Sequence, residues 1–513
     1  MLNIQHLHHV ESYRLSRVVW YPLGNTKWET RMSESVQTEY MTFPKSFSMP
    51  MSNEGFVLTS QCAGRIDEAF VMESGADFLN ESSIDGVVLL RASATQKAEL
   101  ESNTGLKLFE NREYELPQLY PLDMLACETA DEPFDGSNEF KFIVVDELDK
   151  PVLGVAFIVE HGLMFSKAVY SNHLGEVSIQ FGLTVMRILY VRPPENYWPL
   201  LLRGRSHSND PVVIRLTAID LSKHERYVQL LGTPLADDGL GVKIAVIDTG
   251  VARHVDLTAV KKRYAVSKGV VEDDNLREPD WHGTHVAGII GCSHEEVLGH
   301  APAADIVSYR VCPAGKRSMS TADVVVAILN AVAQNVDIIN LSLGFNASDD
   351  AIVEAISYAH SSGVLVVAAV GNDAKGKCSF PASVSDVVAV TALGRGEAYP
   401  FGSSAALQTA RATSGDFFTP YFANFGQAHV GCAAPGVGIV STVNESGYQA
   451  ESGTSMAAPI VSALSATLLS RNLSNLGART PERLNRLRDM LYTSCTRAGF
   501  HAESVGHGVP FVR

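Results

Sequence analysis

The stretch GVKIAVIDTG, residues 241–250, holds a short β-branched apolar run that ends at a Gly-bearing turn, and it sets the pattern for the second half of the chain. Similar runs follow at 306–311, 338–341, 364–370 and 387–390. Segments of helical pattern lie between the runs, at 285–291, 321–335 and 349–361. Near-continuous apolar strands that alternate with helices predict an α/β fold, with a parallel sheet that helices cover on both faces.

The residues before this domain are organised differently. Residues 1–80 have weak periodicity, and we expect an irregular segment with some strands. Residues 81–136 carry strand, helix and strand patterns within about 30 residues, which indicates a small α/β unit. Short β-rich runs separated by turn signals at 137–200 indicate a small β-sandwich, which resembles the carboxypeptidase-regulatory and Ig-like types. We expect a linker at 201–237 and the α/β domain at 238–513.

Composition and charge limit the classes of function. Of the 513 residues, 46% are hydrophobic and 19% are charged, which is ordinary for a globular chain. The formal net charge is −16 and Lys and Arg form no long runs, so neither nucleic acid nor an anionic membrane is an expected partner. No stretch reaches the ~18 consecutive apolar residues that a membrane-spanning helix needs.

The compartment can be inferred from the cysteines and from the first residues. The seven cysteines are scattered and include no CxxC pair, whereas disulfide frameworks and zinc sites show closer, paired spacing. We therefore expect reduced thiols, which suit a reducing compartment. The opening residues MLNIQHLHHV lack the apolar core of a secretory signal, so the expected location is cytoplasmic.

Three polar residues lie at the ends of apolar elements: Asp248 ends a strand, His282 opens a helical stretch of small residues, and Ser455 opens an apolar helix. Taken singly, each has a structural interpretation. A strand-end Asp is usually a turn or a cap, an isolated His is usually structural, and a Ser at a helix start is usually an N-cap. Taken together, they supply a nucleophile, a base and a group that orients the base, which acyl transfer requires.

Two neighbouring polar residues have different interpretations. His285 lies three residues after His282, but without an HExxH pattern the pair does not predict a zinc site, so we interpret His285 as a packing residue. Asn372 follows a strand in VAAVGN, residues 367–372. Gly-Asn on its own is a turn signal, yet the Asn372 amide could donate a hydrogen bond to an oxyanion.

Five motifs occur in one order between residues 241 and 470: AVIDTG, HGTHVAG, INLSLG, AAVGN and GTSMAAP. In these motifs, and in the order Asp, His, Ser, the chain resembles the subtilisin-like serine proteases, the subtilases. The resemblance implies that Asp248 orients His282, that His282 is the general base and then the general acid, and that Ser455 is the nucleophile. It also implies an oxyanion hole formed by Asn372 and the backbone N–H of Ser455.

The same resemblance implies where a substrate binds. One wall of the primary specificity pocket is expected at Ser342, Leu343 and Gly344, and this segment is expected to pair with an extended peptide by β-augmentation. The opposite wall is expected at Ala369, Val370 and Gly371. Val370 is bulkier than the Ala that is usual in the family, which predicts a shallower pocket.

A calcium loop that is usual in the family is altered here. Residues 291–299 are shorter than that loop and lack its usual Asn, although Asp256 matches an outer ligand position. We interpret Glu295 and Glu296 as a solvated turn. The expectation is that no metal or other cofactor is required, with a structural calcium ion as the open alternative.

Two functions of different classes stay open at this point. The first is an active serine endopeptidase that acts on protein or peptide substrates, either in general turnover or as a dedicated maturation protease. The second is a catalytically inactive subtilase fold used for binding, although such proteins typically lose a triad residue and all three are present. The 81–136 unit resembles the family's inhibitory propeptide, which suggests autocleavage between residues 200 and 240.

Overall fold

The computed structural model describes most of the chain, namely residues 38–42, 72, 76–81, 87–104, 107–115, 138–161, 164–165, 168–181, 185–206, 208, 210–223, 228–277, 279–314, 316, 318–345, 347–426 and 430–512. Contacts divide the chain into two compact units, Met1–Val36 and Gln37–Arg513, and all described residues belong to the second. Most of the predicted irregular segment and residues 116–136 of the predicted α/β unit lie outside the described residues.

The central sheet holds ten strands among the described residues: β14 (Lys243–Asp248), β15 (Val260–Ser267), β16 (Val270–Asp273), β17 (Asp305–Arg310), β19 (Ile338–Leu341), β20 (Leu365–Ala369), β21 (Val387–Arg395), β22 (Ala410–Ser414), β23 (Phe417–Pro420) and β24 (Cys432–Pro435). The strands lie in the order β16-β15-β17-β14-β19-β20-β21-β23-β22, and β24 pairs with β21. The inner pairs are parallel.

The α/β fold is confirmed, but the prediction of a wholly parallel sheet is wrong at its edges. Strands β16, β22 and β23 pair antiparallel. The physical reason is clear for β15 and β16, because only Lys268 and Gly269 connect them, with φ of 51° and 74°. A two-residue turn with positive φ at both positions joins antiparallel strands only, since a parallel pair needs a long crossover.

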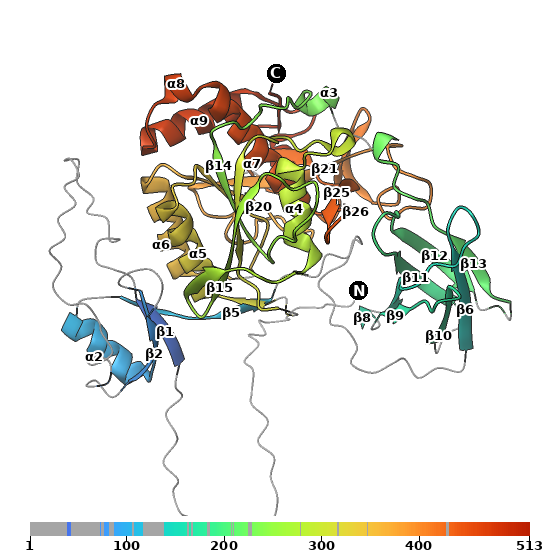
Figure 1. The fold of residues 1–513 in the computed structure, drawn as a ribbon, viewed down its shortest axis with the longest axis horizontal. Coiled ribbons are helices and arrows are strands. Elements are labelled where there is room, and N and C mark those ends of the chain that lie inside the picture. The colour runs from blue at the N-terminus through green and yellow to red at the C-terminus, as the bar shows by residue number, and fades with distance from the viewer. Residues whose placement is uncertain are drawn as a thin grey trace, which may run out of the picture. The chain divides into compact units, whose positions relative to one another are not determined.

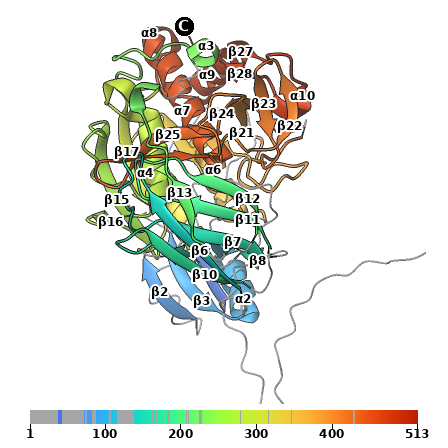
Figure 2. The same cartoon turned by 90° about the vertical axis from the view of Figure 1, so that its right-hand side faces the viewer.

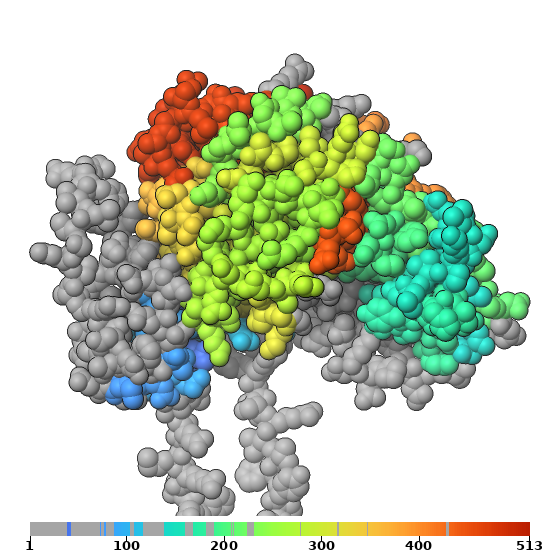
Figure 3. Space-filling model, viewed as in Figure 1, coloured from blue at the N-terminus to red at the C-terminus, as the bar shows by residue number. Residues whose placement is uncertain are grey.

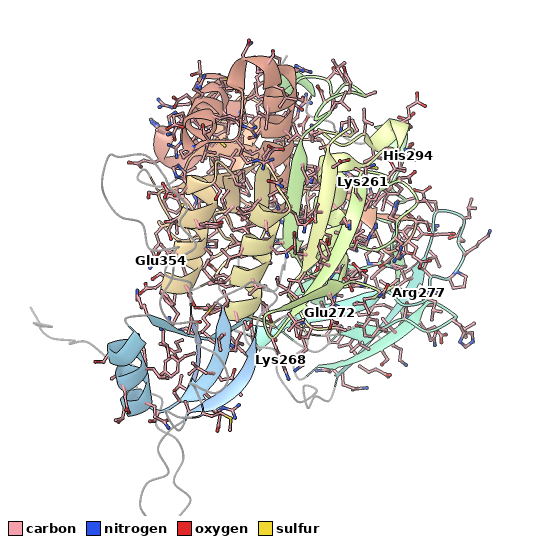
Figure 4. All side chains as sticks on the ribbon, turned by 60° about the vertical axis from the view of Figure 1, so that its left-hand side comes forward. Lys261, Lys268, Glu272, Arg277, His294 and Glu354 are labelled. Atoms are coloured by element: carbon pink, nitrogen blue, oxygen red, sulfur yellow. The ribbon has the colours of Figure 1, made fainter. Side chains whose placement is uncertain are left out.

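Helices cover both faces of this sheet: α4 (Trp281–Gly291), α5 (Thr321–Ala333), α6 (Asp350–Ser361), α7 (Thr454–Arg471) and α9 (Pro481–Thr493). Alternate residues of β14 belong to different apolar clusters. Ile244 and Val246 lie in a cluster with residues of α4, α7 and α9, whereas Ala245 and Ile247 lie in a cluster with residues of α5 and α6. Figure 1 shows α5 and α6 side by side, and Figure 4 marks α6 by Glu354 and the β15–β16 turn by Lys268.

Shorter elements complete the α/β domain: α3 (Val228–Leu231), η2 (Leu221–Lys223), η3 (Glu295–Val297), β18 (Ser318–Ser320), the hairpin β25 (Ile439–Val443) and β26 (Gly447–Glu451), α8 (Leu473–Leu476), β27 (Cys495–Thr496), α10 (Ala502–Val505) and β28 (Val509–Pro510). In the part of the chain that the structure describes, no helix has both the length and the apolar character that a membrane crossing requires.

The N-terminal α/β unit is a four-stranded antiparallel sheet with one helix, formed by β1 (Thr38–Thr42), β2 (Asp77–Glu81), β3 (Val88–Ala92), α2 (Ala94–Thr104) and β4 (Leu108–Glu110). The unit starts earlier than the predicted boundary at residue 81, because β1 lies between β3 and β4 in the sheet. The next strand, β5 (Glu113–Glu115), pairs antiparallel with β18 in the α/β domain.

Two sheets with a common apolar core form the β-sandwich: β6 (Asn138–Val145), β7 (Ala156–His161), β8 (Met164–Phe165), β9 (Val169–Tyr170), β10 (Glu176–Phe181), β11 (Val185–Arg192), β12 (Leu200–Ser206) and β13 (Val212–Arg215). Figure 2 labels all of these strands except β9, which is labelled in Figure 1. The core includes Phe142, Phe157 and Leu189, each no more than 1% exposed.

The segment that we expected as a linker, 201–237, contributes strands β12 and β13 to the sandwich instead. Strand β12 pairs with β11, and β13 pairs with β6 in parallel. Both strands lie at sheet edges, where one side of the strand makes no ladder and the sequence carries exposed charged residues such as Arg203. That mixed composition lacks the clean apolar alternation of an inner strand, so the sequence pattern resembles that of a linker.

Candidate active site

The first two predicted site residues lie in contact. Asp248 is the last residue of β14 and His282 is the second residue of α4, and both are at most 3% exposed. The Asp248 Oδ1 atom lies 2.7 Å from His282 Nδ1. A carboxylate only accepts hydrogen bonds, so Nδ1 carries a hydrogen, and the neutral form of the ring has its lone pair on Nε2.

The backbone brings these two residues together at a tight approach between α4 and the turn after β14. Asp280 caps α4 and accepts a hydrogen bond from the His282 backbone N–H at 3.1 Å. A Cβ atom on Gly283 would lie 2.3 Å from the Gly250 carbonyl oxygen, so only glycine permits the approach. The first glycine of the motif HGTHVAG, Gly283, therefore has a packing reason.

His285 lies on the same helix but has a different environment. Its Nε2 atom lies 3.0 Å from the carbonyl oxygens of Ile439 and Gln449, which belong to the β25–β26 hairpin. Complete burial lowers the pKa of His285 to about 3, so the ring is neutral at ordinary pH and Nε2 donates. His285 thus connects α4 to the β25–β26 hairpin by hydrogen bonds.

Ser455 is the second residue of α7, and helices α4 and α7 pack against each other. The Ser455 hydroxyl donates to the Ser342 carbonyl oxygen at 3.3 Å rather than to His282. In return, the Ser342 hydroxyl donates to the Ser455 carbonyl oxygen at 2.8 Å. That carbonyl is available because Pro459, four residues on, has no N–H to donate. Pro459 lies inside helix α7.

Asn372 lies beside the start of α7. Its Oδ1 atom accepts hydrogen bonds from the backbone N–H and from the hydroxyl of Thr454, each at 2.9 Å. Gly371, whose φ is 100°, donates its N–H to the same hydroxyl at 3.2 Å. These bonds hold the side-chain carbonyl oxygen of Asn372 at the start of α7 and do not use the amide nitrogen, which is the group that can donate.

Asn424 is a site residue that the sequence analysis missed. It is fully buried, and its Nδ2 atom donates to the Val370 carbonyl oxygen at 2.9 Å. Its Oδ1 atom accepts from the backbone N–H groups of Asp373 and Lys375, at 3.1 and 2.8 Å. Asn424 therefore frames the segment that holds Asn372. An Asn in a loop has no local sequence signal that separates this role from a turn.

The residues expected to line the substrate pocket follow two neighbouring strands. Ser342, Leu343 and Gly344 come directly after β19, and Ala369, Val370 and Gly371 end or follow β20. The two segments are joined further on, because the Phe345 N–H donates to the Phe380 carbonyl oxygen at 2.6 Å. The Val370 side chain is fully buried in the apolar cluster of α5 and α6. The shallower specificity pocket that we expected from Val370 stays a prediction.

Asp256, which matches an outer calcium-ligand position in the sequence, has hydrogen-bond and ionisable partners within the protein. Its Oδ2 atom accepts a hydrogen bond from the Tyr448 hydroxyl at 2.6 Å and lies 3.9 Å from His254 Nδ1. Calcium takes six to eight oxygen ligands. Among the described residues, no three His, Cys, Asp or Glu side chains form a group that could hold a metal. Glu295 and Glu296 lie in the short helix η3, which His294 caps.

Residues 239–508 match the family model described as "Subtilase family", and this match covers more than half of the chain. The chain belongs to the subtilase family. The resemblance inferred from the five motifs is thereby confirmed.

Curated relatives agree with this family. The chain is 34% identical over 238 residues to alkaline elastase YaB of Bacillus sp. (strain YaB), covering 46% of this chain and 56% of the relative. It is 33% identical over 250 residues to the thermostable alkaline protease of Halalkalibacterium halodurans, covering 48% of this chain and 62% of the relative. It is 33% identical over 238 residues to subtilisin Savinase of Lederbergia lenta, covering 79% of that protein. The match spans little more than half the length of the first two relatives.

Proposed function

We propose that this subtilase is an active serine endopeptidase that hydrolyses peptide bonds through a covalent acyl-enzyme. The observation that supports it most is the 2.7 Å contact between Asp248 and His282, with His282 and Ser455 on two helices that pack together. The names of the relatives, two of them an elastase and an alkaline protease, point the same way.

The proposed roles follow from the chemistry of each group. His282 Nε2 takes the proton of the Ser455 hydroxyl as Ser455 attacks the scissile carbonyl carbon, and Asp248 stabilises the imidazolium that forms. His282 then protonates the leaving amine, and water hydrolyses the acyl-enzyme by the same route. The Asn372 amide and the Ser455 N–H at the start of α7 stabilise the oxyanion.

The Ser455 hydroxyl bonds to the Ser342 carbonyl oxygen in the free protein. We propose that a bound peptide takes over the backbone groups of residues 342–344, so that the hydroxyl turns to His282. Catalytic hydrogen bonds are often poorly aligned before substrate binds and tighten in the complex, so the present geometry is compatible with this role.

A peptide-hydrolysis assay of matched serine variants tests this proposal. Ser455→Ala should abolish hydrolysis, with a loss on the order of 10⁶ in kcat if the triad acts as a unit. Ser465→Ala is the control, since Ser465 lies on the same helix, is buried and bonds only to the helix carbonyl of Val461. Equal activity of the wild type and Ser455→Ala would overturn the proposal.

The alternative function, an inactive binding protein, makes a separate prediction. A folded wild-type chain that binds extended peptides but hydrolyses none of them would support it. The intact set of Asp248, His282, Ser455 and Asn372 favours the enzyme, because loss of a triad residue is what usually marks an inactive member.

We also propose that the N-terminal α/β unit restrains the peptidase site. Strand β5 pairs with β18 in register, with Tyr114 opposite Met319. The Tyr114 ring lies 4.3 Å from that of Phe345, directly after the predicted pocket wall, and its hydroxyl donates to Asp349 at 2.8 Å. A segment of the chain thus lies beside the predicted substrate wall, as an inhibitory unit requires.

The proposed autocleavage can be narrowed. A cut at residues 200–215 would divide the paired strands β12 and β13 from their sheets, so we confine the proposal to residues 216–240. Mass spectrometry of active enzyme should then find a peptidase fragment that starts in this range. Active enzyme that stays entirely full-length would refute processing.

A further inference from the structure

Arg192, the last residue of sandwich strand β11, contacts the α/β domain with its side chain. Its guanidinium carbon is 4.6 Å from the centre of the Trp281 ring, directly before His282 in the sequence. Its Nη2 atom donates to Glu451 Oε1 at 3.0 Å and to Gln449 Oε1 at 3.3 Å. The Glu451 side chain is only 4% exposed, so this ion pair is largely shielded from water.

These contacts join helix α4, which holds the predicted base, to strand β26, which precedes the helix that holds the predicted nucleophile. Trp281 begins α4, whose second residue is His282. Glu451 ends β26, four residues before Ser455 in α7. The Gln449 carbonyl oxygen also accepts the hydrogen bond from His285, so β26 contacts α4 by a second route. Arg192 therefore bridges the start of α4 and the strand that leads to α7.

The Trp281 ring is placed to restrict His282. The two rings meet edge to face, with centroids 5.5 Å apart at 68°. The same Trp281 ring meets His285 at 6.0 Å and 90°. A cation over the face of Trp281 holds that ring in place, and a ring held in place limits the rotation of the imidazole beside it.

The sandwich is attached firmly enough for Arg192 to have this effect. The Asn196 N–H donates to the Tyr448 carbonyl oxygen at 2.7 Å, and Asn196 Oδ1 accepts from the Tyr448 N–H at 3.0 Å. Trp198 belongs to the apolar core of the α/β domain. Figure 3 shows the β25–β26 hairpin, in red, between α4 and the green and teal residues of the sandwich.

We propose that Arg192 is a positioning residue for catalysis: through Trp281 and Glu451, the sandwich holds His282 in the orientation that proton transfer from Ser455 requires. This inference rests on the proposed peptidase function and assigns the sandwich a part in it. Arg192 contacts neither the triad nor the pocket residues in this structure, so its effect is indirect.

The test is steady-state kinetics of Arg192 variants with active sites counted by a burst titrant. Arg192→Ala should lower kcat roughly tenfold to a hundredfold while KM changes by less than about twofold, because a small misplacement of a catalytic group costs that much and substrate contacts are untouched. Arg192→Lys keeps a cation over Trp281 and should recover part of kcat. Arg203→Ala is the control, an exposed sandwich arginine that should have wild-type kinetics.

A double-mutant cycle with Trp281→Ala tests the route. If Arg192 acts through the ring, the combined variant should lose no more kcat than the worse single variant. Additive losses, or an unchanged kcat in folded Arg192→Ala, would overturn the inference while leaving the peptidase proposal intact. If Arg192→Ala does not fold, the kcat of Arg192→Met is compared with that of Arg192→Lys, since only Lys keeps the charge. A lower kcat for Arg192→Met supports the inference, and equal kcat values overturn it. An inactive wild type would overturn both proposals.

Discussion

At the scale of single residues, the position of Asn372 depends on Asn424. Replacing Asn424 by alanine removes the acceptor of two backbone N–H groups, those of Asp373 and Lys375, while the Val370 carbonyl oxygen keeps its hydrogen bond from the Ser379 N–H. Each unsatisfied buried group costs about 1–3 kcal/mol, so the free energy of unfolding should fall by at least about 2 kcal/mol. Urea unfolding measures this loss of stability, and kcat should fall with it, since Asn372, the proposed oxyanion donor, would be displaced.

The control for this prediction is Asn275→Ala. Asn275 is exposed and bonds only to a nearby carbonyl oxygen, at 3.4 Å, so its loss should change stability by less than about 0.5 kcal/mol. Asn424→Ala with wild-type stability and kcat would mean that Asn424 does not support the oxyanion segment.

His285 gives a pH-dependent stability whose sign can be worked out. Its pKa is about 3 in the folded protein and about 6.5 when exposed, so the unfolded chain binds the proton between these values. The stability that depends on a neutral His285 is fully present above pH 6.5. As the pH falls toward 3, the free energy of unfolding decreases by up to about 1.4 kcal/mol per pH unit. A pH series of urea unfolding should show a shallower slope for His285→Gln than for its parent, both in a Ser455→Ala background. Equal slopes would contradict the assigned burial.

At the scale of elements, the β25–β26 hairpin supplies a hydrogen-bond donor to the Asp256 carboxylate. Tyr448 on β26 satisfies the Asp256 carboxylate, and the Ser293 N–H donates to the Asp256 carbonyl oxygen at 2.8 Å. We propose that stability does not depend on calcium. A calcium ion that binds the folded state, at a free concentration of 100 times its Kd, would raise the free energy of unfolding by about 2.7 kcal/mol. That corresponds to a rise of several degrees in Tm.

Thermal unfolding of Ser455→Ala in calcium and in a chelator checks this proposal, and the two Tm values should agree. Tyr448→Phe should lower Tm in both buffers, because it removes one charge-assisted hydrogen bond to Asp256. For this partly exposed carboxylate, the loss in the free energy of unfolding should be about 1 kcal/mol. A large drop of Tm in chelator alone would show that a metal site exists.

Elements also show how far the sequence alone predicts this protein. The inner strands of the central sheet were predictable, because residues buried on both faces give unbroken apolar runs. The antiparallel edges and strands β12 and β13 were not, since edge strands mix apolar and charged residues. The triad residues were recognised from motif order. Asn424 and Arg192 were missed because their partners lie 54 and 257 residues away in the chain, and no local pattern encodes such contacts.

At the scale of the whole molecule, the sandwich is joined to the α/β domain by side chains and backbone together. Besides Arg192, the Leu201 N–H donates to the Gly402 carbonyl oxygen and the Ser404 N–H donates to that of Pro199, at 3.3 and 2.8 Å. After any cut at 216–240, the N-terminal fragment should therefore remain bound. Size-exclusion chromatography of processed enzyme should show both fragments in one peak, whereas separate peaks would indicate weak docking.

The central claim is that Asp248, His282 and Ser455 form a working active site. A fluorophosphonate probe reacts only with an activated serine, and mass spectrometry locates the adduct. We predict one adduct per chain, on Ser455, which is absent in Ser455→Ala and slowed strongly in His282→Ala. A folded wild type that does not label, or an adduct that persists in Ser455→Ala, would contradict the claim.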